Sequence, residues 1–174
     1  MSLVTTKSII VKCHGTPVQV EATANAAITP GELIEIMSTG KVRAHSTARG
    51  KAEKMFAIEN ELEGEGINTD YDADAQVQAR IFRPGDEVLA LLAQGETAVI
   101  GSWLVSNGDG TLKVWTDYGE SFEVGGSSAA PLSVDMPNPL EVVGVAMEAL
   151  DLEGSSGEES SGLINNARLR VRLV

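Results

Sequence analysis

The chain of 174 residues is long enough to form one domain with its own hydrophobic core. Its 13 basic and 25 acidic residues give a formal net charge of −12, which disfavours nucleic acid and membrane lipids as partners because both attract clustered positive charge. The lone cysteine, Cys13, excludes an internal disulfide, and no apolar run approaches the roughly 18 residues of a membrane span. The first residues lack a signal-peptide pattern, so we expect a protein made and folded in the cytoplasm.

Short apolar runs separated by Gly, Pro, Asn and Asp recur along the chain, a pattern typical of an all-β protein. In the last run three arginines alternate with three apolar residues, which predicts a strand with one basic and one apolar face, and we expect it at the edge of a sheet. Only Ala48–Met55 and Met147–Leu152 compete as helical turns, and neither shows two full turns of amphipathic spacing. The predicted strands are Ile9–Cys13, Val18–Ala24, Leu33–Met37, Val42–His45, Met55–Glu59, Gln76–Phe82, Glu87–Leu92, Trp103–Ser106, Leu112–Trp115, Val142–Met147 and Ala167–Val174.

The chain resembles itself when it is shifted by 70 positions, which aligns Gly31–Val42 with Gly101–Leu112. Each segment reads as an apolar strand, a polar turn ending in Gly and a second strand, and Asn107–Gly110 is the stronger turn. The segments that follow, Phe56–Gly64 and Val143–Gly154, are also alike. Chance matches between β-strands are the alternative. The repeat predicts two hairpin units that face each other in a small β-barrel or barrel-like sandwich.

The domain organisation predicted from these patterns is simple. Residues 1–7 precede the first strand and form a flexible N-terminal arm, and residues 8–174 form a single β domain. This domain contains an insertion at about residues 117–139 and a flexible loop at residues 154–162. The loop is composed of Gly, Ser and Glu, which bury too little apolar area to offset the entropy of ordering them. Because a strand follows it, we interpret it as a long hairpin loop.

No pattern in the sequence predicts an active site. Cys13 and His14 are adjacent, and neighbours on a strand point to opposite faces, so a catalytic Cys–His pair is not expected. Neither Gly-x-Ser-x-Gly nor His-Glu-x-x-His occurs, and Gly64–Gly66 lacks the further glycine and the lysine of a phosphate-binding loop. We therefore predict that the protein is not an enzyme and needs no cofactor.

One acidic segment is similar to the start of a calcium-binding loop. Asp70, Asp72 and Asp74 stand at alternate positions, as the first ligands of such a loop do. The similarity ends at Ala75, where the loop requires glycine, and at Ile81, where it requires a bidentate glutamate. We predict no metal site and interpret the segment as a solvated acidic loop.

A further pattern of turn glycines and apolar residues occupies the middle of the chain. It is carried by the segments Phe56–Glu61, Gly64–Gly66, Arg83–Val88, Leu91–Gly95 and Gly101–Leu112. Their order resembles the capsid decoration, or cement, proteins of tailed-phage heads, and the strand near the C-terminus is similar too. Residues 117–139 and 154–162 have no place in this order.

The resemblance implies a compact β-barrel that forms a homotrimer and binds the major capsid protein on the outer surface of the virion, in a phage assembled in a bacterial host. Such a protein stabilises the shell by bridging its subunits. The N-terminal arm would add a strand to an exposed edge of the capsid protein. Leu3, Val4 and Thr5 suit a strand and Lys7 suits an acidic rim, so these four are the candidate capsid-binding residues.

Two other functions fit some of the residues. A carbohydrate- or host-surface-binding module displayed on the virion would use the aromatic rings of Trp103, Trp115, Tyr71 and Tyr118. A metabolic carrier domain would use Lys54 as a modified lysine, although no turn residue stands beside it.

Overall fold

The structure is a computed structural model that describes residues 8–116, 140–154 and 167–174. Within these ranges, no helix is long and apolar enough to cross a membrane. The described residues form thirteen strands: β1 (Ile10–Lys12), β2 (Val18–Thr23), β3 (Ile34–Ile36), β4 (Val42–Ala44), β5 (Met55–Ala57), β6 (Gln76–Ile81), β7 (Glu87–Leu91), β8 (Thr97–Ala98), β9 (Trp103–Ser106), β10 (Leu112–Val114), β11 (Val142–Ala146), β12 (Leu150–Asp151) and β13 (Arg168–Leu173).

The predicted all-β class is confirmed, because each predicted apolar run contains a strand. The sequence missed only β8 and β12, which have two residues each and are too short to show an alternating pattern. Neither Ala48–Met55 nor Met147–Leu152 forms a helix. The predicted insertion at residues 117–139 lies outside the described residues, and so do residues 155–162 of the predicted loop.

The two predicted hairpins are present and share one register. In the first hairpin, β3 pairs with β4 through Ile34–Ala44 and two further pairs, and adding 70 to every residue number gives the pairs between β9 and β10. The turns agree as well. The backbone N–H of Met37 donates to Lys41 at 2.8 Å, and that of Asn107 donates to Thr111 at 2.9 Å. The repeat seen in the sequence is therefore a repeat of structure.

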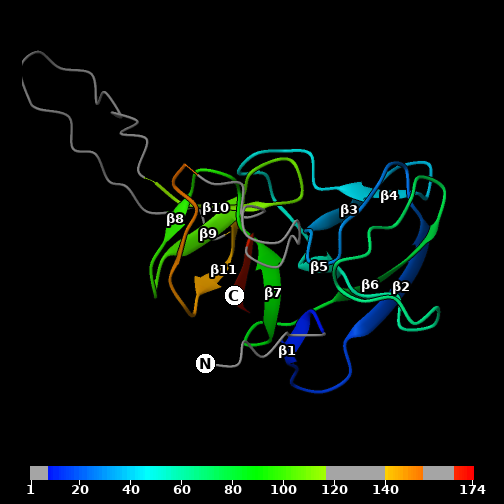
Figure 1. Cartoon of the computed structure of the whole chain (residues 1–174), viewed down its shortest axis with the longest axis horizontal. Coiled ribbons are helices and arrows are strands. Elements are labelled where there is room, and N and C mark those ends of the chain that lie inside the picture. Colours follow the sequence, from blue (N-terminus) through cyan, green and yellow to red (C-terminus); the bar gives the residue numbers. More distant parts are fainter. Residues whose placement is uncertain (1–7, 117–139, 155–166) are drawn as a thin grey trace, which may run out of the picture.

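The structural repeat is longer than the hairpin. The first half of the molecule (residues 18–82) arranges its strands in the order β2-β6-β5-β3-β4, with the Leu33–Phe56 bridge joining β5 to β3. The second half (residues 87–174) repeats this as β7-β13-β11-β9-β10. Parallel bridges, Ala24–Val42 and Leu92–Leu112, bring the outer strands of each half together. Each half is thus barrel-like, although its ladders do not run unbroken around the ring. Figure 1 shows the halves as two lobes on either side of β7.

The expectation that the last strand lies at a sheet edge is wrong. β13 is a central strand of the six-stranded sheet, between β7 and β11. Its apolar face is buried as predicted, since Leu169, Val171 and Leu173 are almost inaccessible. The arginine face did not require an edge position because two arginines bind one carboxylate and Arg168 is buried between the halves.

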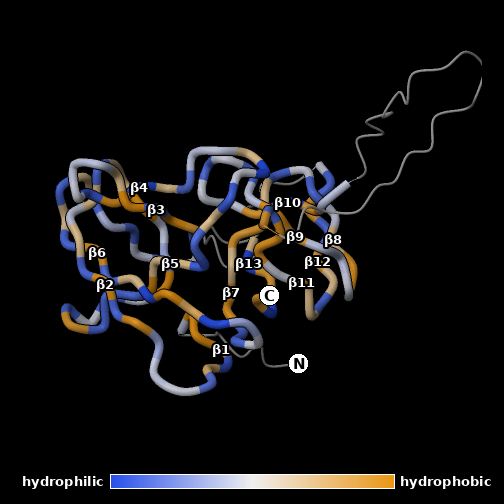
Figure 2. The backbone as a smooth tube through the Cα atoms, turned by 180° about the vertical axis from the view of Figure 1, so that it is seen from behind, coloured by the Kyte–Doolittle hydropathy of each residue, from blue (hydrophilic) through white to orange (hydrophobic). Residues whose placement is uncertain are grey.

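The larger of two hydrophobic cores is shared by the two halves. It combines Leu33, Phe56 and Phe82 of the first half with the inner faces of β7, β9, β11 and β13 of the second, and Phe56 meets Phe82 edge to face at 6.2 Å. The smaller core lies inside the first half. The hydrophobic β7 runs through the centre of the molecule between the halves (Figure 2). Burial of this shared core fixes how the two halves sit against each other.

We expect Phe56→Ala to lower the free energy of unfolding by about 3–5 kcal/mol, because it leaves a cavity where the two halves meet. Leu62→Ala is the control, since Leu62 is 80% exposed and its removal should change the stability by less than about 0.5 kcal/mol. Urea unfolding of the two variants measures both values. Equal stability of the two variants would show that the shared core is not what holds the halves together.

Candidate functional site

A row of side chains crosses the outer face of the six-stranded sheet. Lys12 of β1 pairs with Glu87 of β7, Glu87 with Arg172 of β13, Arg172 with Val145 of β11, and Val145 with Trp103 of β9. Residues directly opposite each other on antiparallel strands point to the same face of the sheet. Lys12, Arg172 and Trp103 are exposed, whereas Glu87 is buried. The row therefore presents cationic and aromatic groups around a buried carboxylate.

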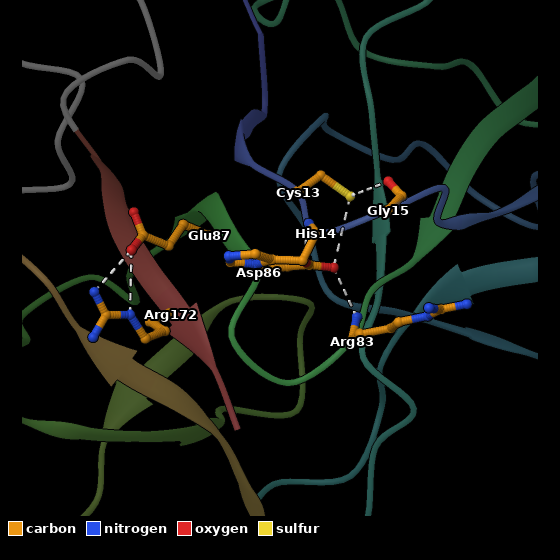
Figure 3. A network of polar contacts seen from close by, with 7 residues as sticks. All are labelled: Cys13, His14, Gly15, Arg83, Asp86, Glu87 and Arg172. Carbon is orange, nitrogen blue, oxygen red and sulfur yellow. Dashed lines mark hydrogen bonds and ion pairs between the residues drawn. The ribbon is translucent and has the colours of Figure 1, made fainter.

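The Glu87 carboxylate is held by two guanidinium groups. Its Oε2 accepts hydrogen bonds from Arg170, with Nε at 2.7 Å, and its Oε1 accepts from Nη2 of Arg172 at 2.9 Å. Figure 3 shows Glu87 and Arg172 facing each other. The hydrogen bonds from Arg170 and then Arg172 outweigh burial and lower the pKa of Glu87 below its ordinary value. The arginine side chains are 44% and 48% exposed, so they also face solvent.

The carboxylate of Asp86, the residue before Glu87, binds backbone groups beside the short segment that connects the two halves. Asp86 is fully buried and accepts hydrogen bonds from the backbone N–H of Arg83 at 2.9 Å and of His14 at 2.6 Å. Figure 3 shows these groups converging on Asp86. Burial alone would raise the pKa of Asp86, but these hydrogen bonds outweigh it and lower the pKa. The carboxylate thus ties the segment after β1 to the turn before β7.

Cys13 and His14 do not lie on opposite faces of a strand, as the sequence had suggested. β1 ends at Lys12, so the alternation of a strand does not extend to them. Both approach Asp86, with Cys13 Sγ at 3.7 Å from Oδ2 and His14 Nδ1 at 3.3 Å from Oδ1. Burial first, and then the charge of Asp86, raise the pKa of the Cys13 thiol. A raised pKa disfavours the thiolate, so this cluster lacks the activated sulfur of a nucleophilic cysteine.

An acidic cleft of about 430 Å³ lies in the first half. Besides Tyr71, its lining is mostly polar and includes the carboxylates of Glu21, Glu63, Glu65, Asp70 and Asp72. Across the described ranges, no three His, Cys, Asp or Glu side chains are arranged to hold a metal ion. Asp74, the third residue of the calcium-like segment, instead binds Lys41 Nζ at 2.6 Å.

The aromatic side chains considered for sugar binding are not gathered in one groove. Tyr71 is buried and its hydroxyl donates to the carbonyl of Ile58 at 2.7 Å. Trp103 and Trp115 are neighbours, since the backbone N–H of Trp115 donates to the carbonyl of Trp103 at 2.8 Å, but neither lines the acidic cleft. Tyr118 lies outside the described residues.

Of the remaining candidate residues, the structure describes Lys54 but not the residues of the N-terminal arm. Lys54 Nζ donates to the carbonyl of Val142 at 2.6 Å, and burial lowers its pKa, so it is not presented on a free turn. The predicted capsid-binding residues of the arm, Leu3, Val4, Thr5 and Lys7, lie outside the described residues.

Sequence reasoning missed the role of Asp86 and Glu87. Their signal was present, since two adjacent acids follow a Pro-Gly turn at the start of a predicted strand, while arginines alternate on the last strand. Only the pairing of β7 with β13, which lie about 80 residues apart in the sequence, brings the opposite charges together. A single sequence does not reveal such a pairing.

We expect Glu87→Gln to lower the free energy of unfolding by about 1.5–3 kcal/mol at pH 7, because hydrogen bonds to a charged acceptor are lost. The folded pKa of Glu87 is lowered, so its contribution is present above the ordinary carboxyl pKa of 4.5 and decreases as the pH falls below it. Urea unfolding at pH 7 and pH 3.5 should therefore show a smaller difference from the wild type at the lower pH. The exposed Glu61→Gln is the control, and an equal loss at both pH values would contradict the assignment.

Comparison with known proteins reveals a shared fold. No protein-family model and no curated protein sequence matches the chain. Among solved structures, the chain is similar to the N base of the head fiber protein gp8.5 of bacteriophage phi29. The similarity has a TM-score of 0.51 at 12% sequence identity, and it covers 91% of this chain and 95% of that chain. The two proteins therefore share a fold over most of both chains.

Proposed function

We propose that the protein is a structural protein of a tailed-phage virion, which decorates the outer surface of the head and bridges subunits of the major capsid protein as a homotrimer. The observation that carries this proposal is the fold shared with the base of a phage head fiber over 91% of the chain. The turn glycines and apolar spacing of residues 56–112, which resemble capsid decoration proteins, support the same class independently of the fold.

The outer face of the six-stranded sheet supports a protein partner. Trp103, Arg170 and Arg172 are all partly exposed on one sheet, and Trp and Arg are the residues that most often dominate binding energy in protein interfaces. The fixed hydrogen bonds of the two arginines to Glu87 hold them in place before binding, which lowers the entropy cost of docking. The net charge of −12 favours protein over nucleic acid at such a surface.

A structural role needs a rigid body rather than a reactive group. The two side chains that the sequence offered to an enzyme or a carrier are tied into the framework, because the Cys13 thiol has a raised pKa and the Lys54 amine is bonded to a carbonyl. Bridging works through several weak contacts that are linked. Once one copy of a trimer is bound, the others meet their sites at an effective concentration in the millimolar range.

A carbohydrate- or host-surface-binding module is the second candidate. It is favoured by the exposed ring of Trp103 and the adjacent Trp115. If these rings hold a sugar, tryptophan fluorescence should change on titration with glycans, and Trp103→Ala should abolish the change. Capsid bridging predicts that glycans leave the fluorescence unchanged.

The proposal is tested by co-sedimentation with phage heads that lack decoration. We expect the full chain to sediment with the heads, and deletion of residues 1–7 to weaken binding by at least about tenfold, because each copy loses a strand that would pair with the capsid protein. A Gly-Ser segment of equal length in place of residues 1–7 controls for chain length. Light scattering should give the same number of chains per particle for all three proteins.

Two outcomes count against parts of this account. Unchanged binding after the deletion would remove Leu3, Val4, Thr5 and Lys7 from the interface. If the full chain fails to sediment with any undecorated head, the proposed function is wrong.

A further inference from the structure

The two halves of the chain bind each other through two different surfaces. The first half contributes a turn, Thr29–Leu33, which packs against β7 and β13 of the second half. The carbonyl of Gly31 accepts from the backbone N–H of Leu91 at 3.2 Å, and the carbonyl of Pro30 accepts from Arg168 Nη2 at 2.9 Å. The approach is so close that a Cβ on Gly31 would lie 2.9 Å from the carbonyl oxygen of Leu89.

The β9–β10 hairpin of the second half extends this contact. The backbone N–H of Leu33 donates to the carbonyl of Gly110 at 2.8 Å. Beside it, His45 Nδ1 lies 2.8 Å from Ser106 Oγ, and both residues are buried. We call Thr29–Leu33 with the chain around His45 the turn surface of the first half. We call the opposing surface the strand surface of the second half, and it consists of the edge of β7, Arg168 and the β9–β10 hairpin.

The structural repeat gives the second half a turn surface of its own. The turn Val99–Trp103 has the same backbone as Thr29–Leu33. In the first turn the N–H of Glu32 donates to the carbonyl of Thr29 at 3.0 Å, and in the second turn the N–H of Ser102 donates to the carbonyl of Val99 at 2.9 Å. Gly31 and Gly101 have similar positive φ values, 101° and 92°. Trp115 follows β10 at the position that His45 occupies after β4.

This second turn surface is exposed and apolar. Pro30 and Leu33 are buried, but the corresponding residues Ile100 and Trp103 are 71% and 46% exposed, and Val99 beside them is 59% exposed. A Cβ built on Gly31 would meet Leu89 and Arg168 of the second half and Ile9, whereas a Cβ built on Gly101 meets no atom of the described residues within 4 Å. Exposed apolar side chains gathered on one turn are typical of an interaction site.

The first half likewise has a strand surface without a partner strand among the described residues. β2 is the outer strand of its sheet, and the pairing of Thr23 with Gln76 corresponds to that of Leu91 with Arg168. The next backbone bonds agree, since the N–H of Ala24 donates to Ala75 and that of Leu92 donates to Ala167, both at 2.8 Å. The backbone N–H of Thr23 consequently points away from β6, as that of Leu91 points away from β13. On the neighbouring β3–β4 hairpin, Ile36 occupies the position that Ser106 has on the β9–β10 hairpin. Ser106 is buried, whereas Ile36 is 53% exposed.

From this correspondence we infer that the turn surface of the second half (Val99–Trp103 and Trp115) binds the strand surface of the first half (β2 and the β3–β4 hairpin) of a second copy of this chain. The internal contact predicts the details. The carbonyl of Gly101 accepts from the N–H of Thr23 of the second copy, and Trp115 packs on Ile36 of the second copy.

The contact is head to tail, because two different surfaces meet. Such contacts repeat from copy to copy and end only when a ring closes. A ring of three copies is what the proposed homotrimer requires, so this inference rests on the self-association part of the proposed function. β2 carries Glu21 and Thr23 where β7 carries Leu89 and Leu91, which makes the contact between copies more polar than the internal one. That difference suits chains that fold before they associate.

The test uses two variants of the full chain, Ile100→Glu and Ile36→Glu, each of which places a charge on one surface only. We expect the wild type to be an oligomer by sedimentation velocity and each variant to need at least about a tenfold higher concentration to associate. Val11→Glu, at an exposed apolar residue outside both surfaces, should associate like the wild type. If a glutamate variant does not melt cooperatively, Ile100→Ser and Ile36→Ser replace the pair.

A mixture of the two variants distinguishes this contact from others. Each Ile36→Glu molecule keeps an intact turn surface and each Ile100→Glu molecule keeps an intact strand surface. An equimolar mixture should therefore form a dimer of twice the monomer mass and nothing larger. A mixture that stays monomeric, or variants that associate like the wild type, would overturn the inference.

Head binding is measured separately on the same proteins. Wild-type protein that sediments with heads but is monomeric in solution and unaffected by either substitution contradicts the contact and leaves the proposed decoration intact. Protein that forms the expected oligomer but ignores heads contradicts the decoration and leaves the contact intact.

Discussion

The contact between the two halves is the constraint on which the rest of the structure depends. Each half is a small ring of short strands, and a unit of that size buries a smaller fraction of its surface than the whole chain does. Joining the halves buries Leu33, Phe56 and Phe82 in one core and places Arg168 against the carbonyls of the first half. Because a close-packed core does not deform continuously, the outer face of the six-stranded sheet is held at a fixed position relative to β2 and the acidic cleft.

The buried acids stiffen this framework where it would otherwise bend. Asp86 sits in the short connection between the halves, where its carboxylate takes up backbone N–H groups that no strand satisfies. Glu87, the next residue, balances two arginines on the central strand of the sheet. Both acids have lowered pKa values, so they stay charged and bonded at neutral pH. Charges used in this way fix the geometry of the connection and of the sheet that follows it.

Much of the fold follows from local sequence patterns, whereas the site does not. Alternating apolar residues located the strands, and Gly40 and Gly110 located the repeated hairpins, because a tight turn with positive φ favours glycine. The edge position expected for β13 was wrong because alternation says which face is polar but not what that face contacts. Here Glu87 binds Arg170 and Arg172, and the first half covers Arg168. The convergence of Cys13 and His14 on Asp86 depends on where β1 ends, which is the least predictable property of a strand.

The repeat also shows at which positions the amino acids of the two halves differ. Positions that hold each half's core keep aliphatic residues in both copies, as Ile34 and Leu104 show. Positions in the contact between the halves have diverged instead. Pro30 and Leu33 fit a closed interface inside the chain, while Ile100 and Trp103 on the same backbone remain exposed. Exposed apolar side chains on this turn cost solubility. Its retention is explained if the backbone of another copy completes the same contact that the second half provides within the chain.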